Sequence, residues 1–234
     1  MMVSTKIANL RALLLLVFLA ATTLVISAAA ARSHSRTHEN ASIGEFDYYL
    51  VSLSWSPSFC ETHRDEKEQC GGRGFGFVLH GVWPQYLRGY GPQHCAANQQ
   101  PDDATILHTL AFMPSRHLVQ HEWETHGACT GMSPTEYFAL ADRAFASVKI
   151  PGAFAAPQSA AQLSAKDVAQ AFIAANPGMD DSMLAVTCSR NELSEVRICM
   201  DKDLHLQTCG KGVTTQCPSG ALRIPLARGG TRTN

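Results

Sequence analysis

The sequence predicts an α+β fold: a single domain in which helices flank a central antiparallel β-sheet and disulfides staple the chain. Signals for helices gather in the middle of the chain, and alternating apolar stretches typical of strands lie before and after them. Eight cysteines follow an N-terminus typical of exported proteins. No internal repeat or linker marks a second domain, so we expect residues 45–234 to form one domain, a size that one core can support.

The first 31 residues are typical of a secretory signal peptide. Lys6 and Arg11 form a basic head, residues 12–31 carry no charge, and the stretch ends in small residues. The uncharged run is long enough to act instead as an uncleaved membrane anchor, but its hydroxyl residues dilute its apolarity and favour cleavage near Ala30 or Ala31. We therefore predict a periplasmic or secreted protein with no stable membrane association after cleavage.

Residues 32–44 are polar and are expected to form a flexible lead-in. They include Asn40, which begins an Asn-Ala-Ser sequon that matters only in a eukaryotic host. The chain has a formal net charge of −1, and removal of two basic and no acidic residues with positions 1–31 makes it −3. Such a small charge indicates neither a polyanion nor a membrane surface as partner, so any attraction to nucleic acid has to be local.

The secondary-structure elements follow from local patterns, in chain order. Residues 46–54 and 75–79 are aromatic and β-branched enough for strands, the second leading into His80. A Ser-Pro-Thr-Glu capping box at 133–136 opens one helix, and Ser164 opens another that stops at Asn176. The apolar residues that share one face of the first helix are Tyr137, Ala141, Ala144, Phe145 and Val148. Later stretches predict strands at 184–188 and 196–200, a candidate strand at 204–206 and a loop at 151–162.

The cysteines predict a disulfide framework rather than a metal or redox site. None of them forms a Cys-x₂₋₄-Cys pair, which argues against a zinc ribbon and a thioredoxin-type motif. In an oxidising compartment the expectation is four disulfides, although eight cysteines allow roughly a hundred pairings. The eight are Cys60, Cys70, Cys95, Cys129, Cys188, Cys199, Cys209 and Cys217.

Two histidine-containing segments carry the candidate chemistry, HGVWP at 80–84 and HEWETHGAC at 121–129. If residues 116–126 are helical, Glu122 and His126 lie four apart on one face. A carboxylate beside an imidazole raises the pKa of the imidazole toward the range of acid–base catalysis.

A metalloprotease site fails on spacing, because His121 and His126 are five residues apart and the zinc motif needs two histidines four apart. We predict no metal site and no cofactor; a zinc site built from other residues has no support in the sequence. The remaining candidates are expected to be surface or satisfied core histidines: His63, His94, His108, His117 and His205.

HGVWP and HEWETHGAC together resemble the two signature segments of the ribonuclease T2 family, whose commoner forms are HGLWP and HEWxKHG-x-C. LSWSPSFC before the first segment and the cysteine spacing also fit, so the resemblance covers most of residues 46–217. GACTGMSPTEYF is similar to the bacterial periplasmic ribonuclease I branch. The resemblance implies an endoribonuclease that cleaves single-stranded RNA, leaves DNA uncut, needs no metal, has little base preference and forms a 2′,3′-cyclic phosphate. A monomer is the default expectation, because the sequence leaves the oligomeric state open.

The same resemblance implies roles for individual residues. His126 is the base that takes the 2′-OH proton, His80 is the acid that protonates the departing 5′-oxygen, and Glu122 stabilises the transition state. His121 contacts the phosphate. The sequence alone does not distinguish the acid from the base.

Base recognition is less defined. Trp83 matches the base-stacking position of the family, although a core tryptophan is the alternative, and Tyr90 between two glycines is a candidate second platform. Two positions depart from the family pattern: Thr125 stands where many members have Lys, and Gln85 where many have Asp.

Two other function classes remain open. A catalytically weak relative could act by binding RNA or a partner protein, but such a module would not need His80, Glu122 and His126. A secreted metalloenzyme would lose its activity in EDTA.

Overall fold

The computed structural model describes residues 43–155 and 160–226. The expected signal peptide, most of the lead-in and Asn40 lie outside these ranges. Within them, no helix combines the length and apolarity needed to cross a membrane.

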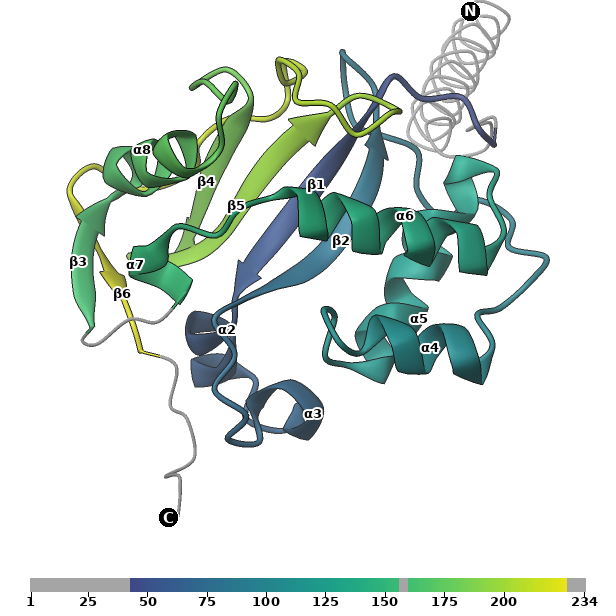
Figure 1. Ribbon diagram of the computed structural model, residues 1–234, viewed down its shortest axis with the longest axis horizontal. Coiled ribbons are helices and arrows are strands. Elements are labelled where there is room, and N and C mark those ends of the chain that lie inside the picture. Colours follow the sequence, from purple (N-terminus) through teal and green to yellow (C-terminus); the bar gives the residue numbers. More distant parts are fainter. Residues whose placement is uncertain (1–42, 156–159, 227–234) are drawn as a thin grey trace, which may run out of the picture. The chain divides into compact units, whose positions relative to one another are not determined.

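A six-stranded sheet forms the centre of the fold and confirms the predicted α+β class (Figure 1). The central strand β1 pairs antiparallel with β2 on one side and β5 on the other, and β4 pairs antiparallel with β5. Strands β3 and β6 form an antiparallel pair that joins the start of β5 through a parallel bridge. The strands are β1 (Tyr48–Trp55), β2 (Phe77–Gln85), β3 (Ala161–Ser164), β4 (Leu184–Ser189), β5 (Glu192–Met200) and β6 (Ala221–Ile224).

Helices occupy the connections between the strands. The two longest helices begin where the sequence predicts: α6 has a complete capping box of Ser133 and Glu136, and α8 one of Ser164 and Asp167. Each box satisfies backbone N–H groups that the first turn leaves free. The helices are α2 (Ser56–Thr62), α3 (Lys67–Cys70), α4 (Asp103–Thr109), α5 (Arg116–Thr125), α6 (Pro134–Ser147), α7 (Gly152–Ala155) and α8 (Ala165–Ala175), with a 3₁₀ turn η1 (Gly127–Thr130) after α5.

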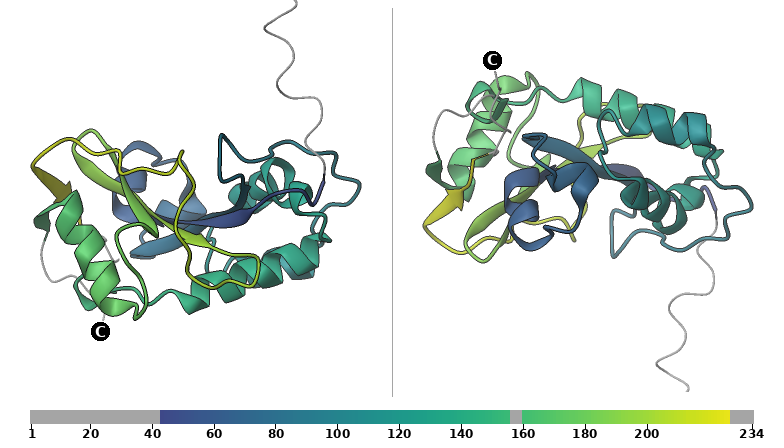
Figure 2. Two further views of the ribbon diagram at one scale, coloured as in Figure 1. Left: turned by 90° about the horizontal axis from the view of Figure 1, so that it is seen from above. Right: turned by 90° about the horizontal axis from the view of Figure 1, so that it is seen from below.

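One face of the sheet forms the main hydrophobic core. Alternate residues of β1 point to this face and are almost completely buried, as expected from the two-residue period of a strand: Tyr49, Val51, Leu53 and Trp55. Helices α6 and α8 lie on one side of the sheet (Figures 1 and 2), and Phe172 of α8 contacts Phe77 of β2 edge-on. The opposite face has a smaller apolar cluster around Tyr48, Leu50 and Cys199, and toward the other end of β1 it presents Ser52 and Ser54.

Three local expectations are wrong. β2 continues through His80 to Gln85 instead of ending before it, because β1 pairs with the whole segment. Residues 204–206 make only one isolated bridge, since Leu204 has a φ of 68° that turns the chain. The expected loop at 151–162 contains α7 and the start of β3; Phe154 of α7 is buried against Trp55 and Phe77 and anchors that turn.

All eight cysteines are paired, which confirms the disulfide framework and supplies its connectivity. Two short loops and two long ones are closed: Cys60–Cys70, Cys95–Cys129, Cys188–Cys217 and Cys199–Cys209. The second bridge ties the segment after β2 to the 3₁₀ turn that follows α5.

Candidate active site

A β-bulge in β2 places the first candidate histidine. Gly81 lies opposite Ser52 and Leu79 opposite Leu53, so that His80 is the extra residue between two paired positions. A bulge turns a side chain away from the regular alternation. The His80 side chain is 33% exposed, although its neighbours in the strand are buried.

The polar face of the sheet surrounds His80. Residues opposite each other in an antiparallel pair share a face, and Trp83 lies opposite Leu50, while Glu195 and Arg197 of β5 lie opposite Ser54 and Ser52. None of these positions belongs to the face that packs against α6 and α8. The two serines are small, so long side chains from β5 have room to pass over β1.

Helix α5 supplies the second group of candidate residues. It begins at the Ser115 cap, whose hydroxyl accepts a hydrogen bond from the Leu118 N–H, and it ends with His126 as its C-cap. Glu122 and His126 are four residues apart, and the His126 N–H donates to the Glu122 carbonyl. The helical expectation for this segment is confirmed.

Gly81 allows Glu122 to approach the strand. A Cβ atom at position 81 would lie 1.9 Å from Glu122 Oε2 and 2.4 Å from Trp83 Nε1. The Trp83 indole N–H donates to the same Glu122 oxygen at 2.7 Å. The carboxylate of Glu122 thus occupies the space that any other residue at 81 would fill.

The structure brings His80, Glu122, Trp83 and His126 into one cluster. His80 Nε2 lies 3.6 Å from Glu122 Oε1. The Trp83 ring is 5.1 Å from the His80 ring and 5.2 Å from the His126 ring, between centroids. Trp83 is half-buried against Tyr48, Leu50 and Cys199, so it is partly a core residue.

The two histidines of the cluster have opposite electrostatic environments. The expectation that Glu122 raises the pKa of His126 is wrong: burial lowers that pKa to about 3, and neighbouring histidines add to this effect. Burial would also lower the pKa of His80, but the hydrogen bond and charge of Glu195, with the charge of Glu122, outweigh it and raise that pKa. Near neutral pH, His126 is therefore a neutral imidazole, whereas the surroundings of His80 favour its charged form. Burial raises the pKa of Glu122 to about 7, against the opposing charge of His80.

Glu195 and Arg197 are the two site residues that sequence reasoning missed. Glu195 binds His80 Nδ1 through Oε1 and accepts a hydrogen bond from Arg197 Nε at 2.8 Å through Oε2. Arg197 Nη2 forms an ion pair with the same oxygen at 2.7 Å. Arg197 also lies over the Trp83 ring, 5.3 Å from its centroid. The available signal was a pair of charged residues at alternate positions of β5, with the apolar residues Val196 and Ile198 after each of them.

The other candidates lie at the edge of this cluster or away from it. His121 is exposed on α5, and its Nδ1 lies 3.5 Å from the hydroxyl of buried Thr125. Partial burial and nearby histidines lower the pKa of His121. Tyr90 is 91% exposed in the loop after β2, a loop that Gln85 ties back by accepting a hydrogen bond from the Gly91 N–H.

The other five histidines among the described residues, at positions 63, 94, 108, 117 and 205, are exposed, as expected. Two of them have surface carboxylates as partners: His108 with Asp142 and His205 with Asp201. Asp201 and His205 also form, with Asp203, a group whose ligand atoms lie close enough together to share a metal ion. That group contains none of the cluster residues.

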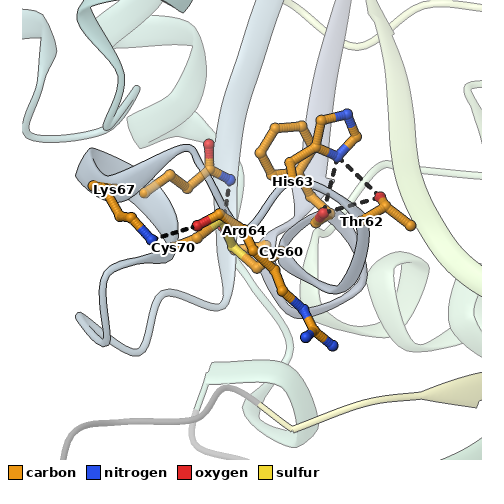
Figure 3. Close-up of a disulfide and its surroundings, with 9 residues drawn as sticks. Cys60, Thr62, His63, Arg64, Lys67 and Cys70 are labelled. Carbon is orange, nitrogen blue, oxygen red and sulfur yellow. Dashed lines mark hydrogen bonds between the residues drawn. A yellow bond between two sulfur atoms is a disulfide. The ribbon is translucent and has the colours of Figure 1, made fainter.

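A cleft of about 360 Å³ opens beside His80. Its lining includes Ser54, His63, Val78, His80, Ser115 and Glu195. Figure 3 shows the wall made by α2 and α3, where the Cys60–Cys70 disulfide joins the helices and His63 Nδ1 lies 3.0 Å from the Phe59 carbonyl oxygen. The His63 ring stacks on Phe59 with centroids 4.1 Å apart.

Comparison with known proteins shows where this arrangement belongs. The model of the ribonuclease T2 family matches residues 46–209. A ribonuclease of Aeromonas hydrophila is 48% identical over 98 residues, which are 42% of this chain and 44% of that protein. A probable ribonuclease of Haemophilus influenzae is 33% identical over 178 residues, 70% of this chain and 61% of that protein. The alignments thus span about half the length of these bacterial relatives.

The fold comparison agrees with the sequence comparison. An RNase-related protein from Calystegia sepium superposes with a TM-score of 0.62 at 24% identity, over 78% of this chain and 98% of that one. The likeness at this identity concerns the fold alone. Because the family model matches most of the chain, and both signature segments lie inside the match at one cluster, the chain belongs to the ribonuclease T2 family.

Proposed function

We propose that this protein is an exported endoribonuclease that cleaves single-stranded RNA by proton transfer to and from two histidines, without metal or cofactor. One observation carries the proposal: two imidazoles lie in one cluster, and burial favours the neutral form of His126 while the carboxylates beside His80 favour its charged form. This is the pair of states that a general base and a general acid need at the same pH.

In the proposed reaction, His126 removes the proton of the ribose 2′-OH, and the 2′-oxygen attacks the adjacent phosphorus. As the new P–O bond forms, the bond from phosphorus to the 5′-oxygen breaks, and His80 Nε2 donates its proton to that leaving oxygen. The products are a 2′,3′-cyclic phosphate and a free 5′-OH. RNA carries its own nucleophile, so the scheme needs no metal-bound hydroxide, and DNA, which lacks the 2′-OH, is not a substrate.

Glu122 is proposed to stabilise the five-coordinate phosphorus of the transition state. With a pKa of about 7 it is largely protonated at mildly acidic pH, when it can donate a hydrogen bond to a phosphate oxygen. Its contact with Trp83 holds the carboxyl group in place. Thr125 offers no cation here, whereas Arg197 supplies a guanidinium over the Trp83 ring.

Substrate placement follows from these roles. Because His80 serves the leaving oxygen, the nucleotide after the cut occupies the cleft beside His80. The exposed part of Trp83 and, farther out, Tyr90 are proposed to stack on bases, a mode that tolerates any sequence. His121 is proposed to contact phosphate when it is protonated.

Export from the cytoplasm completes the proposal, with the monomer as the default oligomeric state. Four disulfides form and persist in oxidising compartments, and residues 1–31 have the pattern of a signal peptide. We propose that these residues are removed and that the mature protein acts outside the cytoplasm.

The test is incubation of the purified, oxidised mature protein with single-stranded RNA and with DNA of the same sequence, at mildly acidic pH, with EDTA and without it. We expect RNA fragments with 2′,3′-cyclic ends and intact DNA. His80→Ala and His126→Ala should each lower cleavage by about 10²–10⁴-fold, and His205→Ala, which removes an exposed histidine, should not. No cleavage by the folded protein would favour the binding alternative, and loss of cleavage in EDTA would favour a metalloenzyme.

A further inference from the structure

Glu195 is a buried carboxylate whose two oxygens have different partners. Its side chain is 8% exposed; one oxygen binds His80 Nδ1 and the other binds the guanidinium of Arg197. Burial opposes ionisation, but these partners together hold the pKa of Glu195 at about 2. The carboxylate is therefore charged throughout the pH range in which a ribonuclease of this kind would act.

The sheet is built so that this contact can form. Glu195 lies on β5 and His80 on β2, and β1 runs between them. At the crossing point β1 presents Ser54 and Ser52, whose small side chains leave room for Glu195 to reach the bulged histidine. A larger residue at either position would fill that space.

A structural ion pair is the simpler explanation, and it does not account for the geometry. Glu195 and Arg197 are two residues apart on one strand, so their pairing links no separate elements. The contact that does link two strands is the one between Glu195 and His80. Burying a carboxylate is costly unless it is paired, and here the pairing is directed at the imidazole of the cluster.

We propose that Glu195, held in place by Arg197, is a positioning residue for His80: it binds the Nδ1–H, fixes the orientation of the ring so that Nε2 faces Glu122 and the cleft, and stabilises the imidazolium. This inference rests on the proposed function, in which His80 is the acid. A carboxylate on one ring nitrogen sets the tautomer and orientation and makes the charged form more stable. Charged or titratable groups face His80 from β5 and α5: Glu195, Arg197, Glu122, His121 and His126.

The first experiment removes the negative charge of Glu195 and keeps the shape of its side chain. Glu195→Gln retains an oxygen that can accept the Nδ1–H but removes the negative charge, so the pKa of His80 falls. We expect kcat to drop about 10–100-fold, KM to change little, and the alkaline limb of the pH–rate profile to move down by about one unit or more. Asp201→Asn, which alters a carboxylate–imidazole pair outside the cluster, is the matched control and should leave the limb in place.

The second variant shifts the same limb in the opposite direction. Arg197 lowers the pKa of His80 through its charge, so Arg197→Met should move the alkaline limb to higher pH, with a smaller loss of kcat. A purely structural ion pair predicts that Glu195→Gln and Arg197→Met lose stability alike and leave the limb unchanged. This variant also keeps the proposal testable if Glu195→Gln does not fold.

A readout without RNA separates the two proposals. NMR titration of the His80 imidazole in the wild-type protein and in both variants measures the effect of Glu195 directly. If the wild type does not cleave RNA, the proposed function fails, while the titration still decides the role of Glu195. An unchanged His80 pKa in Glu195→Gln, with kcat within about twofold of wild type, would overturn the positioning role.

Discussion

In the proposed scheme, the same type of side chain has two different roles because the environments of His126 and His80 differ. His126 lies at the end of α5, 7% exposed, with no hydrogen-bond partner for its Nδ1 among the described residues. His80 sits in a bulge with a carboxylate at each ring nitrogen. Removing an imidazole from water disfavours its charged form, whereas nearby carboxylates favour it.

These opposite shifts predict a bell-shaped dependence of cleavage on pH. In the proposed scheme His126 is a base only while it is neutral, so we expect activity to fall as pH drops toward its pKa of about 3. His80 works as an acid only while it is charged, so activity falls as pH rises through its raised pKa, above the usual 6.5. We expect a plateau on the acidic side of neutrality in a plot of kcat/KM against pH. Maximal activity above about pH 9 would contradict the two-histidine scheme.

At the scale of residues, the sequence could identify His80, Glu122 and His126 because each lies in a short segment with a recognisable pattern. Glu195 could not be identified in this way. Its partner is 115 positions away, and only the pairing of β1 with both β2 and β5 brings them together.

At the scale of elements, α5 can approach β2 closely because Gly81 of β2 has no side chain. Gly81→Ala would place a methyl group on the Glu122 carboxylate, and neither backbone can retreat easily from a paired strand and a packed helix. We expect cleavage to fall about 100-fold as Glu122 and His80 are displaced, with a loss of about 1–3 kcal/mol in the free energy of unfolding.

The matched control is Gly152→Ala in α7, where an added Cβ meets nothing within 4 Å. Kinetics and denaturant unfolding should find that variant close to wild type. Wild-type cleavage by Gly81→Ala would mean that the position of Glu122 is not critical.

Elements whose signals are local were predicted well. The starts of α6 and α8 follow from capping boxes, which involve four consecutive residues. The full length of β2 and the β3–β6 pair were not predicted, because their strand identity depends on distant partners: Ala161 with Ile224, and Tyr48 with Gln85. Composition alone does not encode such pairings.

At the scale of the molecule, disulfides hold the cluster to the rest of the chain. Cys95–Cys129 and Cys188–Cys217 close loops of similar length, with sequence separations of 34 and 29. Loop-closure entropy predicts that loss of either bridge costs about 4 kcal/mol. Of these two bridges, Cys95–Cys129 is the one beside the cluster, because the Cys129 N–H donates to the His126 carbonyl.

We therefore expect two double variants to differ in activity but not in stability. Cys95→Ala/Cys129→Ala should lose cleavage at a temperature where it is still folded, because His126 is no longer anchored. Cys188→Ala/Cys217→Ala should keep cleavage under the same conditions. Unfolding curves and initial rates, measured side by side, check this; equal rates would show that the first bridge serves stability alone.

The pairing of cysteines across the His126 turn also has a meaning for the cell that makes the protein. A newly synthesised chain in a reducing cytosol has thiols at positions 95 and 129. In that state no disulfide holds the turn that follows His126. An RNA-cutting enzyme made beside its producer's own messengers and ribosomes would thus mature only after crossing the membrane. Under the proposed export, formation of the Cys95–Cys129 disulfide would complete the turn only after the enzyme has left the compartment that holds the cell's own RNA.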